Sequence, residues 1–443
     1  MHLHTSWGVH PDPGKGATEG VATRRAPVPA MLVIPLSQHT GVPCKPLVKP
    51  KQEVQRGEMI GDVDALISAP VHASAPGTVE KVEPRPHGGG GFSPSVVLSP
   101  LPGFQPAIPE DIRSLEDALA MPQAEVKAMV RRAGIVGMGG AGFPTHVKLS
   151  PPPPKKVEIC VLNGAECEPF LTADHRVMLE RASDIVDGMR LIMHALGATI
   201  GIIGIEDNKP DAARAMADAA QHAGLRGIVR VQVVHTRYPQ GAEKTLIHTL
   251  TRREVPSGGL PADVGVLVSN VGTAAAVRDA VLKDMPSMER VVTVAGGAVK
   301  SPANLLALVG TPVRVLLEEC GWIPEKAQRV ILGGPLMGVA VPDIEVPVTK
   351  TTSGILALTA AQLAPAREYP CIRCGRCVTA CPMHLVPSAI AALCRNGLEG
   401  KAKASGLLDC FECGSCAYGC PAKIPLVHWM RVGKAALRRT RAA

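Results

Sequence analysis

The sequence predicts a multidomain protein of mixed α/β and α+β class. Two observations support this prediction: strand-like and helix-like segments alternate through the middle of the chain, and its last part carries two near-identical runs of four cysteines. The chain has 443 residues, enough for two to four domains of roughly 100–200 residues each. Its hydrophobic content of 46% and charged content of 19% exclude a disordered chain.

Shifts in residue pattern indicate five consecutive parts. The first is an irregular N-terminal segment, the second an all-β module and the third an α/β domain with a mostly parallel sheet. A small α+β module and a helical domain that contains the cysteine runs complete the chain. The expected bounds, in the same order, are 1–30, 31–104, 108–287, 288–350 and 355–443.

Little helix is expected in the first hundred residues. Residues 1–30 are rich in Gly, Pro and His, and we expect their three histidines to be mobile and not to bind metal. Short apolar runs broken by glycine and proline then predict β-strands. The glycine-rich run at 87–91 is expected to be a flexible break. The strand-like runs are 32–34, 59–60, 66–67, Val71 and 78–79.

From about residue 108, helical and strand-like segments alternate. A capping-box pattern at 114–117 and a helix at 123–133, ended by Gly134, come first. The alternation predicts a largely parallel sheet. In the module that follows, Thr311 and Pro312 are expected to be the N-cap and first residue of a helix. The expected strands are 157–162, 199–205, 229–234 and 265–268, and the expected helices are 174–197, 210–224, 241–253 and 273–284.

The two cysteine runs carry the clearest chemical signal. Each has the spacing C-x2-C-x2-C-x3-C-P, starting at Cys371 and at Cys410, which is the spacing of two-cluster bacterial ferredoxins. Three thiolates two residues apart can hold one face of a 4Fe–4S cube, while the fourth, before proline, points to the other cube. The predicted ligand sets are Cys371, Cys374, Cys377 and Cys420 for one cluster and Cys410, Cys413, Cys416 and Cys381 for the other.

Zinc and disulfides fit these runs less well. Structural zinc usually takes two separated C-x2-C pairs per site. Disulfides need an oxidising compartment, and we recognise no secretion signal at the N-terminus. The remaining cysteines are expected to be small buried residues, with Cys167 set apart by its acidic neighbours. They are Cys44, Cys160, Cys167, Cys320 and Cys394.

Polar loops follow three of the expected strands, at 163–169, 238–245 and 269–273. Ligands of open α/β sheets bind beyond the carboxyl ends of the strands, so loops that converge there predict a polar pocket. Taken singly, each loop is an ordinary strand–helix turn.

A glycine-rich stretch precedes these loops. Residues 137–142 match G-x-G-x-x-G, but a helix comes before them and Phe-Pro follows, so the context excludes a Rossmann fingerprint. The glycines still let backbone amides approach a phosphate or a flat ring, and Lys148 can neutralise phosphate charge. A connector without a ligand is the alternative.

These motifs resemble a known family. The glycine-rich loop, Lys148 and the three polar loops resemble, in the same order, the flavin-binding, NADH-oxidising subunit of respiratory complex I. With the N-terminal β module and the cysteine runs, residues 7–436 resemble the C subunit of the Rnf electron-transport complex. The resemblance implies a barrel-sandwich-like N-terminal module, FMN in the α/β domain with NAD(H) stacked on it, and a β-grasp-like small module.

The resemblance also implies the binding residues. Phe143 and Glu168 are expected to face the dinucleotide. The chain departs from the complex I pattern at Ala165 and Ala242, where that family has carboxylates. The expected FMN contacts are Gly137, Gly139, Gly140, Lys148, Asn163, Glu166, Tyr238, Gly241, Glu243, Asn270 and Thr273.

The implied function is electron relay. A nicotinamide exchanges two electrons as a hydride and an iron–sulfur cluster exchanges one, so a flavin is needed between them. We therefore expect an oxidoreductase subunit of an ion-translocating membrane complex, which relays electrons between NAD(H), FMN, two 4Fe–4S clusters and other subunits. No catalytic side chain is expected.

Composition limits the other partners. The net charge is +8, but only 2% of the residues are aromatic, so a nucleic-acid partner is not expected. No apolar run reaches the ~18–20 residues of a membrane span. Peripheral association is expected, on the cytoplasmic face of the bacterial inner membrane. A basic C-terminal tail suits docking on membrane subunits or anionic lipid, and a solvated helix explains it equally well. Its residues are Lys423, Arg431, Lys434, Arg438, Arg439 and Arg441.

Two rival functions share these modules. One is a soluble, cobalamin-reducing flavin/iron–sulfur protein of bacterial microcompartments, which would not purify with membranes. The other is an iron–sulfur wire with an empty flavin site, which would contain iron but no flavin and would not respond to NADH.

Overall fold

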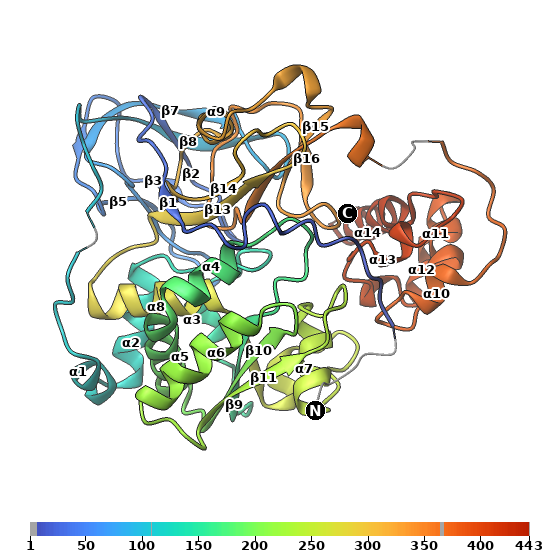
Figure 1. The fold of residues 1–443 in the computed structure, drawn as a ribbon, viewed down its shortest axis with the longest axis horizontal. Helices are drawn as coiled ribbons and strands as arrows, with labels where there is room; N and C mark the ends of the chain where they lie inside the picture. Colours follow the sequence, from blue (N-terminus) through green and yellow to red (C-terminus); the bar gives the residue numbers. More distant parts are fainter. Residues whose placement is uncertain (1–6, 108, 364–366, 443) are drawn as a thin grey trace.

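The computed structural model describes residues 7–107, 109–363 and 367–442, with side chains up to residue 439. His2, His4 and the side chain of Arg441 lie outside the described residues. Four folded units are visible in Figure 1: the all-β module, the α+β module beside it, the α/β domain below both, and the helical C-terminal domain to one side. No helix in the described part of the chain is both long and apolar enough to cross a membrane.

The all-β module consists of two small sheets, in the orders β2-β8-β7-β4 and β3-β5-β6. Their inward apolar side chains, such as Leu32, Ile34 and Leu98, are fully buried. The prediction of an all-β module is confirmed. Its strands are β2 (Leu32–Pro35), β3 (Lys45–Pro46), β4 (Glu53–Val54), β5 (Met59–Asp62), β6 (Val71–His72), β7 (Gly77–Pro86) and β8 (Phe92–Pro100).

Two expectations within this module are wrong. Leu66 and Ile67 form a bend and no strand, and their side chains are 79% and 37% exposed, because no neighbouring strand covers them. Residues 87–91, expected to be a flexible break, do not interrupt the module. They form the turn of the β7–β8 hairpin, which the amide of His87 closes on the carbonyl of Gly91 at 3.0 Å.

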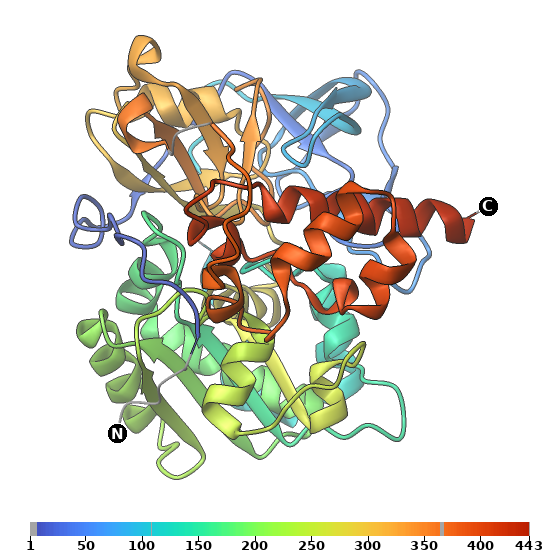
Figure 2. The ribbon, with the colours of Figure 1, turned by 90° about the vertical axis from the view of Figure 1, so that its right-hand side faces the viewer.

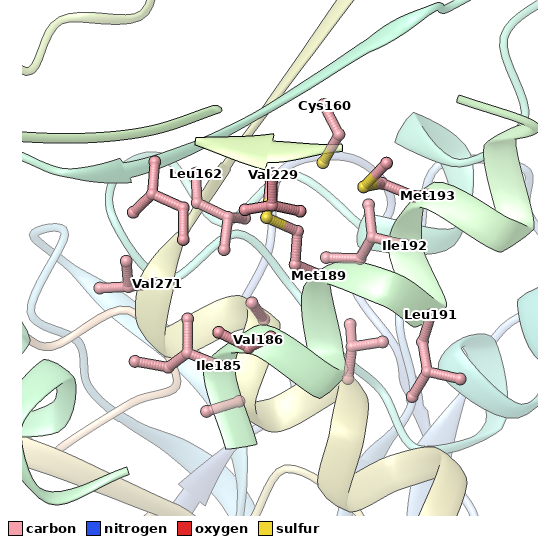
Figure 3. Close-up of a cluster of buried hydrophobic side chains, with 14 of the residues drawn as sticks. Cys160, Leu162, Ile185, Val186, Met189, Leu191, Ile192, Met193, Val229 and Val271 are labelled. Carbon is pink, nitrogen blue, oxygen red and sulfur yellow. The ribbon is translucent and has the colours of Figure 1, made fainter. Parts of the chain in front are cut away.

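The α/β domain contains a four-stranded sheet in the order β11-β10-β9-β12, and all its pairs are parallel as predicted. Alternate residues of each strand face two separate apolar clusters, which explains the continuous apolar runs. Figure 3 shows one face, with Cys160 and Leu162 packed over Ile185 and Met189. The strands are β9 (Ile159–Gly164), β10 (Ile200–Glu206), β11 (Val229–Val234) and β12 (Val266–Asn270).

The helices of this domain lie close to their expected positions. Ser114 accepts a hydrogen bond from the amide of Asp117 at 3.0 Å, as the capping pattern predicts. The helix expected at 174–197 is two helices, because Arg181 leaves helical geometry between them. The helices are α1 (Leu115–Ala120), α2 (Gln123–Arg132), α3 (Thr145–Lys148), α4 (Ala173–Glu180), α5 (Ala182–Leu196), α6 (Pro210–His222), α7 (Glu243–Thr251) and α8 (Val271–Leu282), with a 3₁₀ turn at Pro261–Val264.

Replacing Gly188 with alanine is expected to destabilise this domain. A Cβ at this position would lie 1.9 Å from the carbonyl oxygen of Ala274, where α5 crosses α8. Overpacking of this kind costs about 1–3 kcal/mol, so the denaturation midpoint should fall. Gly16→Ala is the control, because a Cβ there meets only one side-chain atom, at 4.0 Å. Equal midpoints for the two variants would contradict the close crossing.

The α+β module contains a six-stranded sheet in the order β1-β14-β13-β17-β15-β16. Helix α9 (Val313–Glu319) begins one residue later than expected, so Pro312 takes the N-cap position. The buried hydroxyl of Thr311 has no hydrogen-bond partner among the described residues. The strands are β1 (Arg24–Arg25), β13 (Glu289–Ala295), β14 (Ala303–Leu308), β15 (Arg329–Leu332), β16 (Val339–Val341) and β17 (Gly354–Leu358), with 3₁₀ turns at Pro324–Lys326 and Ala360–Gln362.

This sheet draws on segments outside the expected bounds of the module. Strand β1 comes from the N-terminal segment and pairs in parallel with β14. Strand β17 follows residue 350 and pairs with both β13 and β15. The bounds expected from the sequence, 288–350, therefore do not coincide with the bounds of the folded α+β module.

The C-terminal domain repeats one structural unit 39 residues apart (410 − 371 = 39). Figure 2 shows this domain in front of the gap between the upper modules and the α/β domain. Its helices are α10 (Arg376–Thr379), α11 (Pro387–Arg395), α12 (Glu399–Ala404), α13 (Ser415–Tyr418) and α14 (Leu426–Ala442), with a 3₁₀ turn at Leu407–Asp409. Positive φ angles recur at matched positions, in the pairs Arg373 and Glu412, Gly375 and Gly414, and His384 and Lys423.

Candidate functional site

The four sequence-predicted loops meet beyond the carboxyl ends of the parallel strands. The side-chain amide of Asn163, at the end of β9, donates to the carbonyl of Gly241 at 2.8 Å. The amide of Met138 in the glycine-rich loop donates to the hydroxyl of Thr273, at the start of α8, at 2.9 Å. The predicted convergence of these loops is therefore present in the fold.

Lys148 joins two of the loops electrostatically. It lies at the end of α3, and its ammonium group contacts the carboxylate of Glu243 at 3.1 Å and donates to the carbonyl of Val268 at 3.2 Å. Both side chains of the ion pair are about a third exposed. The pair thus sits at an accessible edge of the site, where water screens it.

The glycine-rich loop has open space above it. Gly139 lies close to Asn270, since a Cβ on Gly139 would be 3.0 Å from that side chain. Gly140 is exposed, and a Cβ there would meet no atom within 4 Å. The backbone of Phe143, whose side chain is half-buried, closes the loop by accepting the amide of Gly137 at 2.9 Å. We refer to this loop, residues 137–142, as the cradle, because Gly139 and Gly140 are exposed and the space beside Gly140 is open.

Two predicted site residues also cap helices. The carboxylate of Glu166 accepts the amides of Asp174 and His175, at the start of α4, at 2.7 and 3.1 Å. The side-chain oxygen of Asn270 accepts the amides of Gly272 and Thr273 at the start of α8. The amino ends of both helices are therefore anchored at the site, which favours negative charge there.

Glu168 and Tyr238 lie where three domains meet. The Glu168 carboxylate accepts the amides of Leu336 and Met337, between β15 and β16, at 3.1 and 2.8 Å. The hydroxyl of Tyr238, whose ring is 2% exposed, donates to the carbonyl of Cys413 at 2.5 Å. Burial raises the pKa of Glu168, and the amides that it accepts oppose this shift.

Sequence reasoning missed two charged residues under the cradle. Arg290, from β13 of the α+β module, is 4% exposed and donates to the carbonyl of Met138 at 2.9 Å. Asp174 accepts the side-chain amide of Asn270 at 2.6 Å, and burial followed by the charge of Glu166 raises its pKa. No spacing rule in the sequence links these residues to the loop, because they come from different elements.

One predicted set of cluster ligands surrounds a cavity. Cys381 from the first run lines it together with Cys410, Cys413 and Cys416 from the second. Among the described residues, no three His, Cys, Asp or Glu side chains are close enough to hold a single metal ion. The four thiols instead face a shared space, as the ligands of a larger group would.

The second set lies at the surface. Cys371 and Cys374 are exposed, Cys377 is half-buried, and Cys420 is buried. Of the other cysteines, four are buried as predicted, while Cys167 is half-buried in the loop after β9. The buried four are Cys44, Cys160, Cys320 and Cys394.

Four family models match successive parts of the chain. They describe the RnfC barrel sandwich hybrid domain, the Nuo51 FMN-binding domain, the SLBB domain and the 4Fe–4S dicluster domain. The matched residues are, in that order, 3–100, 130–279, 291–340 and 370–424. The predicted fold class and the predicted FMN and 4Fe–4S cofactors are confirmed by these matches.

Curated relatives extend the match to nearly the whole chain. The C subunit of the proton-translocating ferredoxin:NAD(+) oxidoreductase complex of Clostridium ljungdahlii is 46% identical, over 97% of this chain and 93% of the relative. The chain belongs to the family of C subunits of ion-translocating Rnf complexes. The C subunit of the Na(+)-translocating ferredoxin:NAD(+) oxidoreductase complex of Acetobacterium woodii is 45% identical, over 96% of this chain and 95% of the relative.

A third relative of this family matches the chain, and one solved structure shares its fold. The C subunit of the ion-translocating oxidoreductase complex of Rhodobacter capsulatus is 42% identical, over 97% of this chain and 82% of the relative. An NAD+-reducing NiFe-hydrogenase in its air-oxidized state shares the fold alone, with a TM-score of 0.52, 17% identity and coverage of 74% of this chain and 69% of that one. The chain is thus a subunit of a multi-subunit Rnf complex that transfers electrons by FMN and 4Fe–4S groups.

Proposed function

We propose that this Rnf-family protein exchanges electrons with NAD(H) at the carboxyl edge of its parallel sheet and with partner subunits at its exposed cysteine run. The observation that supports this most directly is the contact between Tyr238 and Cys413. It joins a loop of the FMN-binding domain to the backbone of a cluster-ligand run, with no other domain between them. This contact supports the proposal that the flavin site and a cluster site are neighbours.

The cradle fits an anionic cofactor such as FMN. The open space over Gly140 admits a ligand, the amide-rich loop lies beside the start of α8, and Lys148 supplies a positive charge at the edge. We assign the phosphate and ring contacts to the eleven residues predicted from the sequence, of which Asn163 and Asn270 also order the loops. When bound, FMN supplies the exchange between hydride and single-electron transfer.

The cysteines fit two clusters of different surroundings. We propose that Cys381, Cys410, Cys413 and Cys416 hold the cluster nearer the FMN-binding domain, since their cavity adjoins the Tyr238 contact. The remaining four ligands include the exposed Cys371 and Cys374, so their cluster faces the partner. Three of the first four ligands, Cys381, Cys413 and Cys416, are buried, whereas exposure of Cys371 and Cys374 allows close approach of another protein.

Phe143 and Glu168 are the two residues expected on the dinucleotide side of the site. Phe143 is half-buried beside the cradle, and we propose that its ring faces the dinucleotide. The Glu168 carboxylate already accepts two amides of the β15–β16 connection. We therefore propose that Glu168 acts on the dinucleotide side of the site by holding that connection in place.

Attachment to the membrane is proposed to occur through partner subunits on its cytoplasmic face. Arg438 and Arg439 are exposed near the end of α14 and suit an anionic surface. Arg431 and Lys434 are less available, because both form ion pairs with Glu412 beside the cluster-ligand run. Within the basic tail, Arg431 and Lys434 therefore form ion pairs inside the C-terminal domain, and Arg438 and Arg439 remain for contact with an anionic surface.

An anaerobic NADH titration of the chain reconstituted with FMN and iron tests the proposed function. Bleaching of both the flavin and the cluster absorbance bands is expected, because both redox sites belong to one chain. Titration with dithionite gives the full extent of reduction as the control. Clusters that dithionite reduces but NADH leaves oxidised, in a chain without bound flavin, would overturn the proposal.

A further inference from the structure

The loop after β9 has an unfavourable backbone conformation. Residues 163–171, the end of β9 and the loop that follows it, carry three predicted binding residues, and two non-glycine residues of the loop have positive φ angles, Glu166 at 45° and Phe170 at 67°. Such conformations persist only where surrounding groups hold them in place, and they are concentrated at functional sites. The groups that hold this loop are therefore of functional interest.

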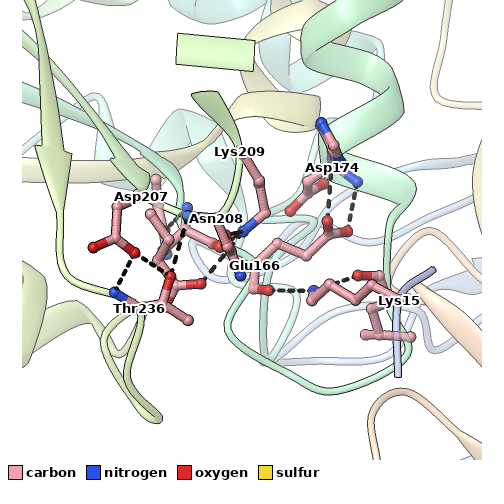
Figure 4. A network of polar contacts seen from close by, with 12 residues as sticks. Lys15, Glu166, Asp174, Asp207, Asn208, Lys209 and Thr236 are labelled. Atoms are coloured by element: carbon pink, nitrogen blue, oxygen red, sulfur yellow. Dashed lines mark hydrogen bonds and ion pairs between the residues drawn. The ribbon is translucent and has the colours of Figure 1, made fainter. Parts of the chain in front are cut away.

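Two buried lysines bind the carbonyl groups of this loop. Lys15, 5% exposed, donates to the carbonyl of Glu166 at 2.7 Å and to that of Leu171. Lys209, 1% exposed, donates to the carbonyl of Ala165 at 2.7 Å. Figure 4 shows both ammonium groups in one polar network with Glu166. These hydrogen bonds go to the carbonyl of Glu166, which has a positive φ angle, and to those of Ala165 and Leu171, which are next to residues with positive φ angles.

The segment around Lys15 also fixes Phe170. The amide of Phe170 donates to the carbonyl of Pro13 at 2.7 Å. Gly14 lies against the ring, since a Cβ on it would be 2.9 Å from the Phe170 side chain. Nearer the N-terminus of the same segment, Val9 pairs with Tyr238 through two backbone hydrogen bonds. One stretch outside the FMN-binding domain thus holds loops from two of its strands.

The charges around Lys15 are closely matched. The groups that act on it are Glu166, Glu206, Lys209 and Cys167. Burial lowers the pKa of Lys15, and the two carboxylates oppose that shift. Lys209 is paired with Glu206 at 3.3 Å, so its charge is largely compensated. The bonds that Lys15 makes go to the carbonyls of the loop itself.

We propose that Lys15 is a positioning residue for the flavin site. Through the carbonyls of Glu166 and Leu171 it holds residues 163–171 in the conformation that sets Asn163 and Glu166 for FMN. This inference rests on the proposed function, because it assigns FMN to that loop. It also gives the N-terminal segment, which the sequence pattern leaves irregular, a defined role in cofactor binding.

The test compares Lys15→Met with Lys15→Arg in the full chain. In the FMN-free protein, hydrogen exchange of peptides within 163–171 should accelerate in Lys15→Met. Its affinity for FMN, measured by flavin fluorescence, should fall by about tenfold or more, because ordering the loop then opposes binding. Lys15→Arg should show slower hydrogen exchange and higher FMN affinity than Lys15→Met, since a guanidinium can donate to two carbonyls.

Lys350→Met is the matched control. Lys350 is also a buried lysine that donates to two carbonyls, those of Pro70 and Gly134, outside the loop. The Lys350→Met variant should have a lower melting temperature, but hydrogen exchange of residues 163–171 should not become faster. Gly14→Ala, which pushes the segment off Phe170 while keeping Lys15, carries the test if Lys15→Met does not fold, and should show the same losses.

Two outcomes would overturn the proposal. One is unchanged exchange of 163–171 in Lys15→Met, and the other is an equal loss of FMN affinity in Lys350→Met. A wild-type chain that binds no FMN would refute the proposed function, while the exchange of the FMN-free loop would still decide whether Lys15 holds it.

Discussion

Replacing Gly140 with valine is expected to lower the affinity for FMN by about 100-fold or more, equivalent to about 2.7 kcal/mol of binding free energy. A Cβ at Gly140 meets no protein atom within 4 Å, so the variant should fold. The added side chain would occupy the cradle that the cofactor needs. Flavin fluorescence quenching gives the dissociation constant, and a thermal melt checks the fold.

Gly400→Val is the matched control for this experiment. Gly400 is also exposed, and a Cβ there meets no atom within 4 Å, but it lies in α12 of the C-terminal domain. Its FMN affinity should equal that of the wild-type chain. If Gly140→Val binds FMN as tightly as Gly400→Val, the glycine-rich loop is not the cofactor cradle.

Double alanine variants of the cysteines are expected to separate the two possible ligand pairings by iron content. A single Cys→Ala change at any of the eight proposed ligands should remove one cluster and about half of the iron. Cys381→Ala combined with Cys410→Ala should lose no more, because both cysteines are proposed to bind the same cluster. Cys381→Ala combined with Cys371→Ala should lose nearly all of it.

The opposite pairing gives the opposite result. If each run held its own cluster, the Cys381 and Cys371 pair would lose one cluster and the Cys381 and Cys410 pair would lose both. Groups that act as a unit are non-additive in this way, which makes the double variants more informative than single ones. Cys394→Ala is the control, since Cys394 is buried outside the cavity and should leave the iron content unchanged.

Local patterns in the sequence were sufficient for much of this fold. The alternation of strands and helices between 157 and 284 predicts the parallel sheet, because each short apolar run must be buried on both faces. The spacing of the cysteines predicts two sets of cluster ligands, and one cavity is lined by Cys381 together with Cys410, Cys413 and Cys416. Both inferences rest on spacings that can be read directly from the sequence.

Boundaries were less predictable than elements. Strand β1 joins a sheet whose other strands lie at least 260 residues away (289 − 25 = 264), and the run at 66–67 is apolar without being a strand. A hydrophobic run indicates that its residues can be buried. The strand or helix that covers the run comes from elsewhere in the chain. Pattern alone cannot supply that partner.

The sequence by itself determined the domain order, the parallel sheet and the cofactor-binding motifs of this protein. Only the tertiary structure revealed that Lys15 donates to the carbonyl of Glu166, that Arg290 donates to the glycine-rich loop from another domain, and that Tyr238 contacts Cys413. The physical reason is that hydrogen bonds to backbone carbonyls require only a donor at the right place. Such hydrogen bonds require no particular spacing in the sequence. A lysine or arginine that donates to a backbone carbonyl therefore cannot be distinguished in the sequence from one that does not.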